Sequence, residues 1–297
     1  MSVPAAYIGI ILIWSTTPLA IQWSSNEVGC LFGITSRMIL GILGGLLVAG
    51  LFNIRLPWHT AARRTYLAAG LGLFLSMTSV YWSAQFIPSG WVSVLFGLAP
   101  IITGAMASFW LAEQALTPAR VTGMLLGLAG LAIMLLGSQQ LGQRAVYGIA
   151  GMVFSVTAYS ASAIAVKRIA ADIPALATTI GALAVTVPLL LLVCILTGEP
   201  LPARVPARAA ISIIYLGLVG SVLGFAMYYY VLSHVAATRV ALITLITPIT
   251  ALLLGHVLNG EALQAEALAG SATILSGLLL FEYGQQAGRW VRDTMIG

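Results

Sequence analysis

The chain has 297 residues, of which 60% are hydrophobic and 7% are charged, and its mean hydropathy is +1.02. Soluble domains carry about 25% charged residues, so this composition excludes one large soluble domain. The net charge of +5 comes from basic residues scattered over short polar stretches. It therefore does not indicate a nucleic-acid-binding surface, which would need a basic stripe with exposed aromatic residues.

Long apolar blocks alternate with short polar stretches along the whole chain. About 20 helical residues cross a hydrocarbon core of roughly 30 Å. We therefore predict an all-α integral membrane protein with ten transmembrane helices, at residues 4–21, 28–51, 66–86, 89–111, 121–137, 146–166, 174–197, 209–231, 240–258 and 264–281. The short connectors leave no room for a soluble catalytic or nucleotide-binding domain.

The basic residues in the connectors are divided unequally between the two sides of this arrangement. With a cytoplasmic N-terminus, the inner connectors and the C-terminal tail hold nine lysines and arginines, and the outer connectors hold three. This imbalance follows the positive-inside rule. We predict a multi-pass protein of the bacterial inner (plasma) membrane with both termini in the cytoplasm.

The second half of the sequence repeats the first. An ungapped overlay with a shift of 148 residues aligns Tyr81 with Tyr229, Pro100 with Pro248, and Glu113 with Glu261. Because each copy has five helices, the second copy must cross the membrane in the opposite sense, as in secondary transporters with inverted repeats. We predict a first five-helix repeat at 1–137, a connector at 138–145, a second five-helix repeat at 146–283, and a cytoplasmic tail at 284–297.

These repeated residues resemble the paired domains of EamA-type proteins in the drug/metabolite transporter superfamily, nearest the YddG-type amino-acid exporters. The resemblance covers nearly the whole chain and includes the two prolines, the two glutamates, Arg37 and the Trp-Ser pair of the first helix. It implies a secondary transporter that exports amino acids, aromatic and neutral ones included, or facilitates the movement of these and related small metabolites. The mechanism that it implies is alternating access around a cavity between the two halves.

Three other functions are weighed against this one, and one of them is a non-catalytic membrane subunit or channel. A multidrug or other metabolite exporter of the same superfamily would share the same fold. An intramembrane enzyme would need clustered acidic or histidine residues at membrane depth, which the apolar blocks lack. Because phosphate-binding loops, zinc patterns and nucleophile elbows are also absent from the sequence, we expect no enzyme activity, catalytic residue, metal or cofactor.

Hydroxyl and aromatic side chains recur at similar depth on several apolar blocks. Such groups suit a polar pathway for a small solute, although any single serine or threonine can instead bond a neighbouring helix or its own backbone. The candidates for the substrate pathway are Trp14, Ser15, Ser76, Ser79, Tyr81, Trp91, Tyr159, Tyr228, Tyr229, Thr244 and Thr247.

Three further kinds of residue are singled out. Arg37 lies within an apolar block, where it either contacts a substrate carboxylate or ties helices together. Pro100 and Pro248 fall in the middle of their helices, where a kink either gates the pathway or shapes it statically. Glu113 and Glu261 precede helices, where capping is favoured over proton coupling.

The fifth and tenth helices carry small residues at helical spacing, Gly123, Gly127 and Gly130 in one and Ala272, Ser276 and Gly277 in the other. Small residues allow close helix contact in a membrane. We assign these faces to the scaffold or to a homodimer contact, so the protein is expected to be a monomer or a homodimer. Its expected partners are a small-molecule solute and the lipid bilayer.

Overall fold

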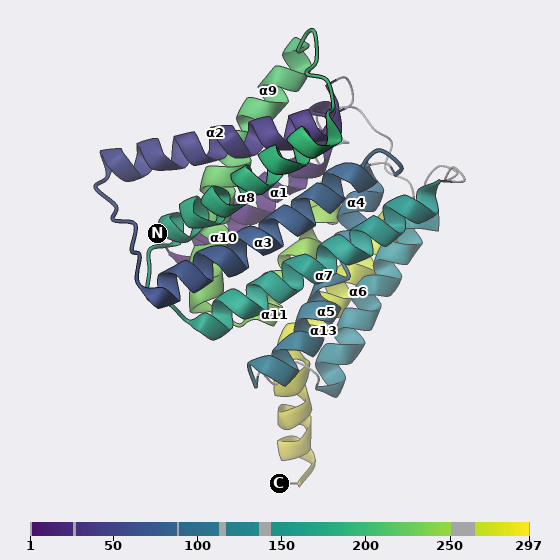
Figure 1. The fold of residues 1–297 in the computed structure, drawn as a ribbon. Helices are drawn as coiled ribbons and strands as arrows, with labels where there is room; N and C mark the ends of the chain where they lie inside the picture. The colour runs from purple at the N-terminus through teal and green to yellow at the C-terminus, as the bar shows by residue number, and fades with distance from the viewer. Residues whose placement is uncertain are drawn as a thin grey trace.

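The computed structural model describes residues 2–25, 28–87, 89–112, 117–136, 144–250 and 265–296, which form helices and turns without a strand. Figure 1 shows these helices packed into one bundle. The first half contains α1 (Val3–Trp23), α2 (Cys30–Leu51), α3 (Thr60–Ser83), α4 (Ser89–Phe96), α5 (Ala99–Trp110) and α6 (Pro118–Leu136). The second half contains α7 (Ala145–Ile169), α8 (Ala175–Thr197), α9 (Ala207–Tyr215), the π-helix η1 (Leu216–Gly224), α10 (Phe225–His234), α11 (Ala237–Ala241), helical residues 243–250, and α13 (Ala265–Ile296).

The surface of the bundle is apolar. Among the described residues, five helices are long and apolar enough to cross a membrane, namely α1, α2, α7, α8 and the continuous helix Ala207–His234. Large side chains on them point outward, with Leu47 64% and Ile195 76% exposed. Water would disfavour such a surface, whereas lipid solvates it while helices satisfy their own backbone hydrogen bonds. The chain is therefore a multi-pass helical membrane protein.

Helices of the two halves are interleaved. Helix α3 packs on α7 and α8, α2 packs on α8 and η1, α1 packs on α10, and α6 packs on α13. These contacts follow the internal repeat. The 148-residue shift aligns α1 with α7, α2 with α8, α6 with α13 and the end of α3 with α10. The contact between α1 and α10 therefore corresponds to that between α7 and α3, and the pairs α2–α8 and α6–α13 each join a helix to its own repeat. A cavity at the centre of such an arrangement must be lined by both halves.

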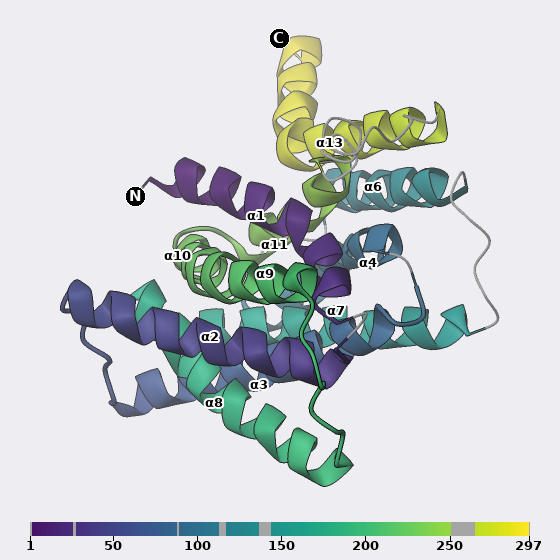
Figure 2. The same cartoon turned by 90° about the horizontal axis from the view of Figure 1, so that it is seen from above.

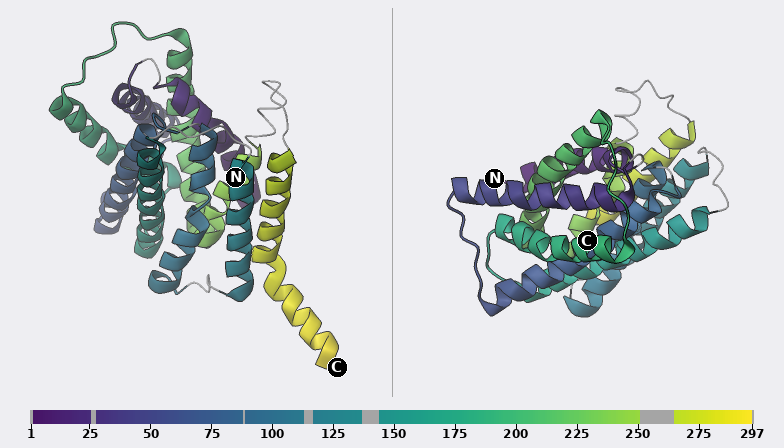
Figure 3. Two further views of the ribbon diagram at one scale, coloured as in Figure 1. Left: turned by 90° about the vertical axis from the view of Figure 1, so that its right-hand side faces the viewer. Right: turned by 45° about the horizontal axis from the view of Figure 1, so that its top comes forward.

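Helices α6 and α13 lie alongside each other at one edge of the bundle (Figure 2). A Cβ atom added to Gly123 would lie 2.5 Å from the carbonyl oxygen of Gly277, and one added to Gly277 would lie 2.5 Å from that of Gly123. The small-residue faces predicted for these helices therefore meet within the chain. Beyond this contact the C-terminal end of α13 projects away from the bundle (Figure 3).

Three helices differ clearly from their predicted extents. Helix α13 continues to Ile296, whereas the prediction ended it at residue 281 and placed a tail at 284–297. Helix α3 begins at Thr60 rather than at residue 66 because the His59 side chain caps it, accepting a hydrogen bond from the Ala62 amide at 3.3 Å. Hydropathy places this boundary too late because Arg63 and Arg64 are charged yet form helix readily. The block predicted as one helix at 89–111 is two helices, α4 and α5, separated by a turn at residues 97–98.

Candidate functional site

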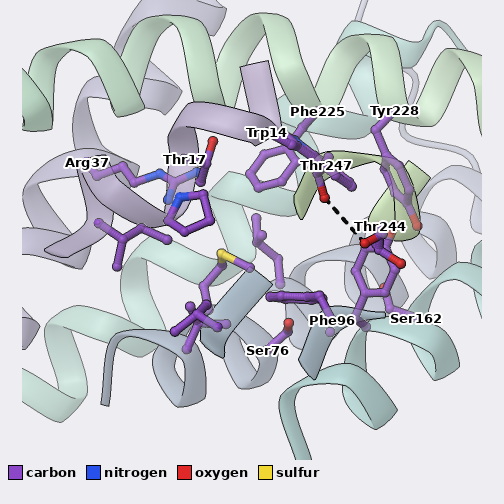
Figure 4. Close-up of a pocket in the computed structure, with 18 of the residues that line it drawn as sticks. Trp14, Thr17, Arg37, Ser76, Phe96, Ser162, Phe225, Tyr228, Thr244 and Thr247 are labelled. Carbon is purple, nitrogen blue, oxygen red and sulfur yellow. Dashed lines mark hydrogen bonds between the residues drawn. The ribbon is translucent and has the colours of Figure 1, made fainter. Parts of the chain in front are cut away.

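A cavity of about 90 Å³ lies between the two halves. This volume is several times the roughly 10–15 Å³ that one buried water molecule requires on the same scale. Its wall is formed by α1, α2, α3, α4, α7, α10 and residues 243–250. The wall combines hydroxyl groups and aromatic rings, from Trp14, Thr17, Ser76, Phe96, Tyr159, Ser162, Phe225, Tyr228, Tyr229, Thr244 and Thr247 (Figure 4).

Arg37 supplies a cation to this wall. Its side chain is 2% exposed, and its Nε atom donates a hydrogen bond of 3.0 Å to the Ser221 hydroxyl. The guanidinium carbon lies 6.0 Å from the centroid of the Phe225 ring. Its Nη1 atom is buried without a hydrogen-bond partner among the described residues. Because an unpaired buried donor is costly, this atom is a candidate to bind an anionic group.

The π-helix η1 allows Arg37 to approach so closely. A Cβ atom added to Gly220 would lie 3.4 Å from Arg37 Nη2, and one added to Gly217 would lie 3.1 Å from the Arg37 carbonyl oxygen. Glycines at both positions therefore leave room for α2 against η1. Short π-helical segments inside α-helices are frequent at functional sites.

Aromatic rings gather on the other side of the cavity. The ring centroids of Trp14 and Tyr228 are 5.5 Å apart, those of Tyr159 and Tyr228 are also 5.5 Å apart, and those of Trp14 and Tyr159 are 6.2 Å apart. Phe96 adds an edge-to-face contact with Tyr159 at 6.1 Å. These separations lie in the favourable range for aromatic pairs. Figure 4 shows Tyr228 at the side of the cavity opposite Arg37, with Trp14 and Thr17 between them.

The hydroxyl groups of the wall are partly committed to helix backbones. Thr244 donates to the carbonyl oxygen of Ala241 at 2.8 Å, and Thr247 donates to that of Thr244 at 3.4 Å. Pro248 lacks the N–H that would bond the Thr244 carbonyl in a regular helix, so the Thr247 hydroxyl partly replaces it. The oxygen atoms of these hydroxyls can still accept hydrogen bonds from a solute.

Most of the predicted pathway residues lie in this wall. They are Trp14, Ser76, Tyr159, Tyr228, Tyr229, Thr244 and Thr247, and Arg37 joins them.

Four others lie outside the cavity lining. Ser15 bonds the Ile11 carbonyl oxygen and the Thr250 hydroxyl. Tyr81 is 1% exposed and lies 3.4 Å from the Ser24 hydroxyl. Ser79 and Trp91 are half-buried elsewhere. The hydropathy pattern cannot show which face of a helix points inward, so these polar groups look identical to the lining ones in the sequence.

The two prolines occupy different positions in their helices. Pro100 lies in the first turn of α5, directly after the break that follows α4, where its missing N–H removes no helical bond. The mid-helix position predicted for Pro100 is therefore wrong, because the chain breaks before it. Pro248 is buried within helical residues 243–250. Glu113 and Glu261 lie outside the described residues.

Comparison with known proteins identifies the family. The sequence pattern of the EamA-like transporter family matches residues 4–136 and again residues 146–283. The chain belongs to this family. Each match coincides with one of the two interleaved halves, so this EamA-like transporter encloses its cavity between two copies of one unit. The resemblance inferred from the prolines, glutamates and Arg37 is confirmed.

Individual relatives are distant, and the extent of their matches differs. A "Probable terminal-alkyne amino-acid exporter" of Streptantibioticus cattleyicolor is 26% identical over 280 residues, 90% of this chain and 92% of that protein. A "Probable amino-acid metabolite efflux pump" of Salmonella typhimurium is 33% identical over 82 residues, 28% of this chain and 27% of that protein. One solved crystal structure superposes with a TM-score of 0.78 at 21% identity, covering 95% of this chain and 98% of that chain. At that identity the superposition supports the fold.

The apolar part of the wall was not predicted. Phe96 and Phe225 line the cavity, as do Met77 and Ile21. In a membrane helix an apolar side chain can face the lipid, the protein core or a cavity. The residue type therefore does not show which apolar side chains line the cavity. The sequence does place a glycine beside each phenylalanine, Gly97 after Phe96 and Gly224 before Phe225. Both glycines lie where the regular α-helix is interrupted, and this pattern could have indicated the two phenylalanines.

Proposed function

We propose that this EamA-like transporter moves amino acids and related small metabolites across the bacterial inner membrane as a secondary transporter. The observation that carries the proposal is the cavity between the two repeats, which combines hydroxyl groups, aromatic rings and a buried guanidinium. Pockets that bind small molecules are largely apolar with a few placed polar groups. The names of the relatives from Streptantibioticus and Salmonella agree with this substrate class.

The proposed topology is ten spans in two inverted five-helix repeats, at 1–137 and 146–283, with both termini in the cytoplasm. The spans are α1, α2, α3, α4 with α5, α6, α7, α8, α9 through α10, the helix beginning with α11, and α13. The reciprocal packing of helices under the 148-residue shift supports the inversion. The excess of basic residues in one set of connectors supports the orientation.

The proposed mechanism is alternating access, with the protein in an outward-facing arrangement. At the end of the bundle where α1 begins, the Tyr7 hydroxyl donates to the Arg239 carbonyl oxygen at 2.9 Å, and Lys167 Nζ donates to the Leu232 carbonyl oxygen at 2.9 Å. The cavity residues of α1, from Trp14 to Ile21, lie toward its opposite end. Pro248, which lies within helical residues 243–250, marks the helix that would bend when the halves rock.

Flux into liposomes that contain the purified full chain tests this proposal. We expect saturable exchange of labelled phenylalanine or leucine that empty liposomes do not show. Ethidium, a hydrophobic cation, serves as the probe for the alternative of multidrug export. Ethidium flux without amino-acid flux would favour that alternative, and no saturable flux of any tested amino acid would refute the proposal.

A further inference from the structure

The charge balance of the cavity limits which part of a solute it can recognise. Among the described residues that line it, Arg37 alone carries a formal charge. The described acidic side chains, Asp172, Glu199 and Glu266, are exposed near helix ends. Among the lining residues that the structure describes, a solute therefore meets a guanidinium with an unused donor and no carboxylate to pair with an ammonium group.

The geometry of Arg37 prepares it for a carboxylate. The Nε atom donates a hydrogen bond to Ser221, and Nη1 has no partner among the described residues. Hydrogen bonds between an arginine and a carboxylate in a site of low dielectric are among the strongest that proteins make. Binding of a carboxylate would also remove the cost of the buried, unpaired Nη1 donor.

The Tyr228 ring cannot hold the ammonium group of an amino acid whose carboxylate is on Arg37. Figure 4 shows Arg37 and Tyr228 on opposite sides of the cavity, whereas the two charged groups of an α-amino acid are attached to one carbon atom. A carboxylate on Arg37 therefore brings the ammonium close to the guanidinium, where like charges repel. The side chain of the solute then extends toward Trp14, Tyr159 and Tyr228, whose packed rings form an apolar surface.

We propose that the cavity recognises a carboxylate attached to an apolar or aromatic body and does not recognise the ammonium group. Its substrate class is then amphipathic monocarboxylates, which include amino acids together with their N-acylated and deaminated analogues. This inference rests on the proposed transport function and assigns Arg37 as the carboxylate-binding residue.

A panel built on one skeleton tests the inference by direct binding to the purified full chain. The ligands are L-phenylalanine, N-acetyl-L-phenylalanine, 3-phenylpropanoate, 3-phenylpropanamide and phenethylamine, and binding is measured as ligand-dependent thermal stabilisation. We expect all three carboxylates to bind, with N-acetyl-L-phenylalanine and 3-phenylpropanoate binding at least as tightly as L-phenylalanine. The amide and the amine should bind at least about tenfold more weakly, which is the loss expected from one charge-assisted hydrogen bond.

Variants assign the carboxylate preference to Arg37. In Arg37→Gln the ratio of 3-phenylpropanoate to 3-phenylpropanamide affinity should fall to about one, a readout that general destabilisation would not produce. Ser221→Ala keeps the guanidinium and should keep the preference. If Arg37→Gln does not fold, Arg37→Lys retains a charge without the planar fork and should reduce the ratio.

The outcomes separate the inference from the proposed function. Strong binding of phenylalanine and phenethylamine together with weak binding of 3-phenylpropanoate would overturn the inference and leave amino-acid transport standing. A carboxylate preference that persists unchanged in Arg37→Gln would overturn the assignment of Arg37. Absence of binding and of flux for every ligand would overturn both.

Discussion

Arg37 shows how a costly residue is kept in a membrane protein. Burying a charge at membrane depth costs about 2.5–3.5 kcal/mol on insertion scales unless protein or water compensates. Here the Ser221 hydroxyl and the Phe225 ring compensate part of the charge, and Nη1 has no partner in the part of the chain that the structure describes. The two roles weighed for this residue, a structural tie and a substrate contact, are compatible because they use different atoms of the same guanidinium.

Trp14 tests the aromatic side of the cavity. Replacement Trp14→Ala removes its contacts with Tyr159 and Tyr228, and each aromatic pair is worth about 0.5–1.5 kcal/mol beyond area burial. We expect the half-saturation concentration for phenylalanine flux to rise by about tenfold. Trp14→Phe keeps a ring and should restore most of the affinity. An equal rise of the half-saturation concentration in both variants would show that an aromatic ring at position 14 is not sufficient for affinity.

Some helices of this protein pack so closely that only glycine, which lacks a Cβ atom, fits at the contact. A Cβ atom added to Gly72 of α3 would overlap the Cβ atom and hydroxyl of Ser162 on α7. No comparable contact exists at Gly50 of α2, where nothing described lies within 4 Å of an added Cβ atom. These two positions allow a matched comparison of packing with intrinsic helix propensity.

We expect Gly72→Ala to lower the melting temperature in detergent by several degrees, because overpacking costs about 1–3 kcal/mol. Gly50→Ala should be neutral or slightly stabilising, since alanine is favoured over glycine in a helix by about 1 kcal/mol. The double variant Gly72→Ala with Ser162→Gly moves the side-chain atom from one helix to the other and should recover stability. Additive loss in the double variant would contradict this close contact.

The contact between α7 and the end of α10 is a candidate latch for the proposed cytoplasmic side. Lys167 Nζ donates to the carbonyl oxygens of Leu232 and Val235 in the last turn of α10 and just beyond it. A cation in this position satisfies carbonyl groups that the helix end leaves unpaired. Opening the cavity to the cytoplasm would separate these groups.

Lys167→Met should shift the protein toward the inward-facing state. Hydrogen bonds to charged groups are worth about 1.5–3 kcal/mol, so a cysteine placed at Thr244 should react about tenfold faster with an impermeant thiol reagent in inside-out vesicles. Arg168→Met removes the same charge from an exposed neighbour and serves as the control. An equal effect of both variants would indicate an electrostatic change without a latch.

The arrangement of the whole chain predicts where its connectors lie. With inverted repeats of five spans, residues 52–59 and the C-terminus face the cytoplasm, and residues 198–206 face the outside. Alkaline phosphatase fused after residue 202 should be active, because the enzyme folds only outside the inner membrane. Fusions after residue 55 or at the C-terminus should be inactive. An active C-terminal fusion would refute the cytoplasmic position of the C-terminus.

The amino-acid sequence alone was enough to establish the membrane class, the internal repeat and the family. Hydrophobic length, the 148-residue shift and the positions of Pro100, Pro248 and Arg37 are local properties that can be counted along the chain. They do not depend on how helices are rotated against each other, since lipid imposes the same length and polarity on every span.

The wall of the cavity depended on the folded chain. Ser76 lines it, whereas Ser79, one helical turn away, and Tyr81 do not. Phe96 and Phe225 join the wall although nothing polar marks them. The rotation and spacing of the helices decide which side chains line the cavity. Close contacts between distant segments, such as Gly72 with Ser162 and Gly217 with Arg37, set that rotation and spacing. Because such contacts join residues more than 80 positions apart, a pattern read along the chain cannot contain them.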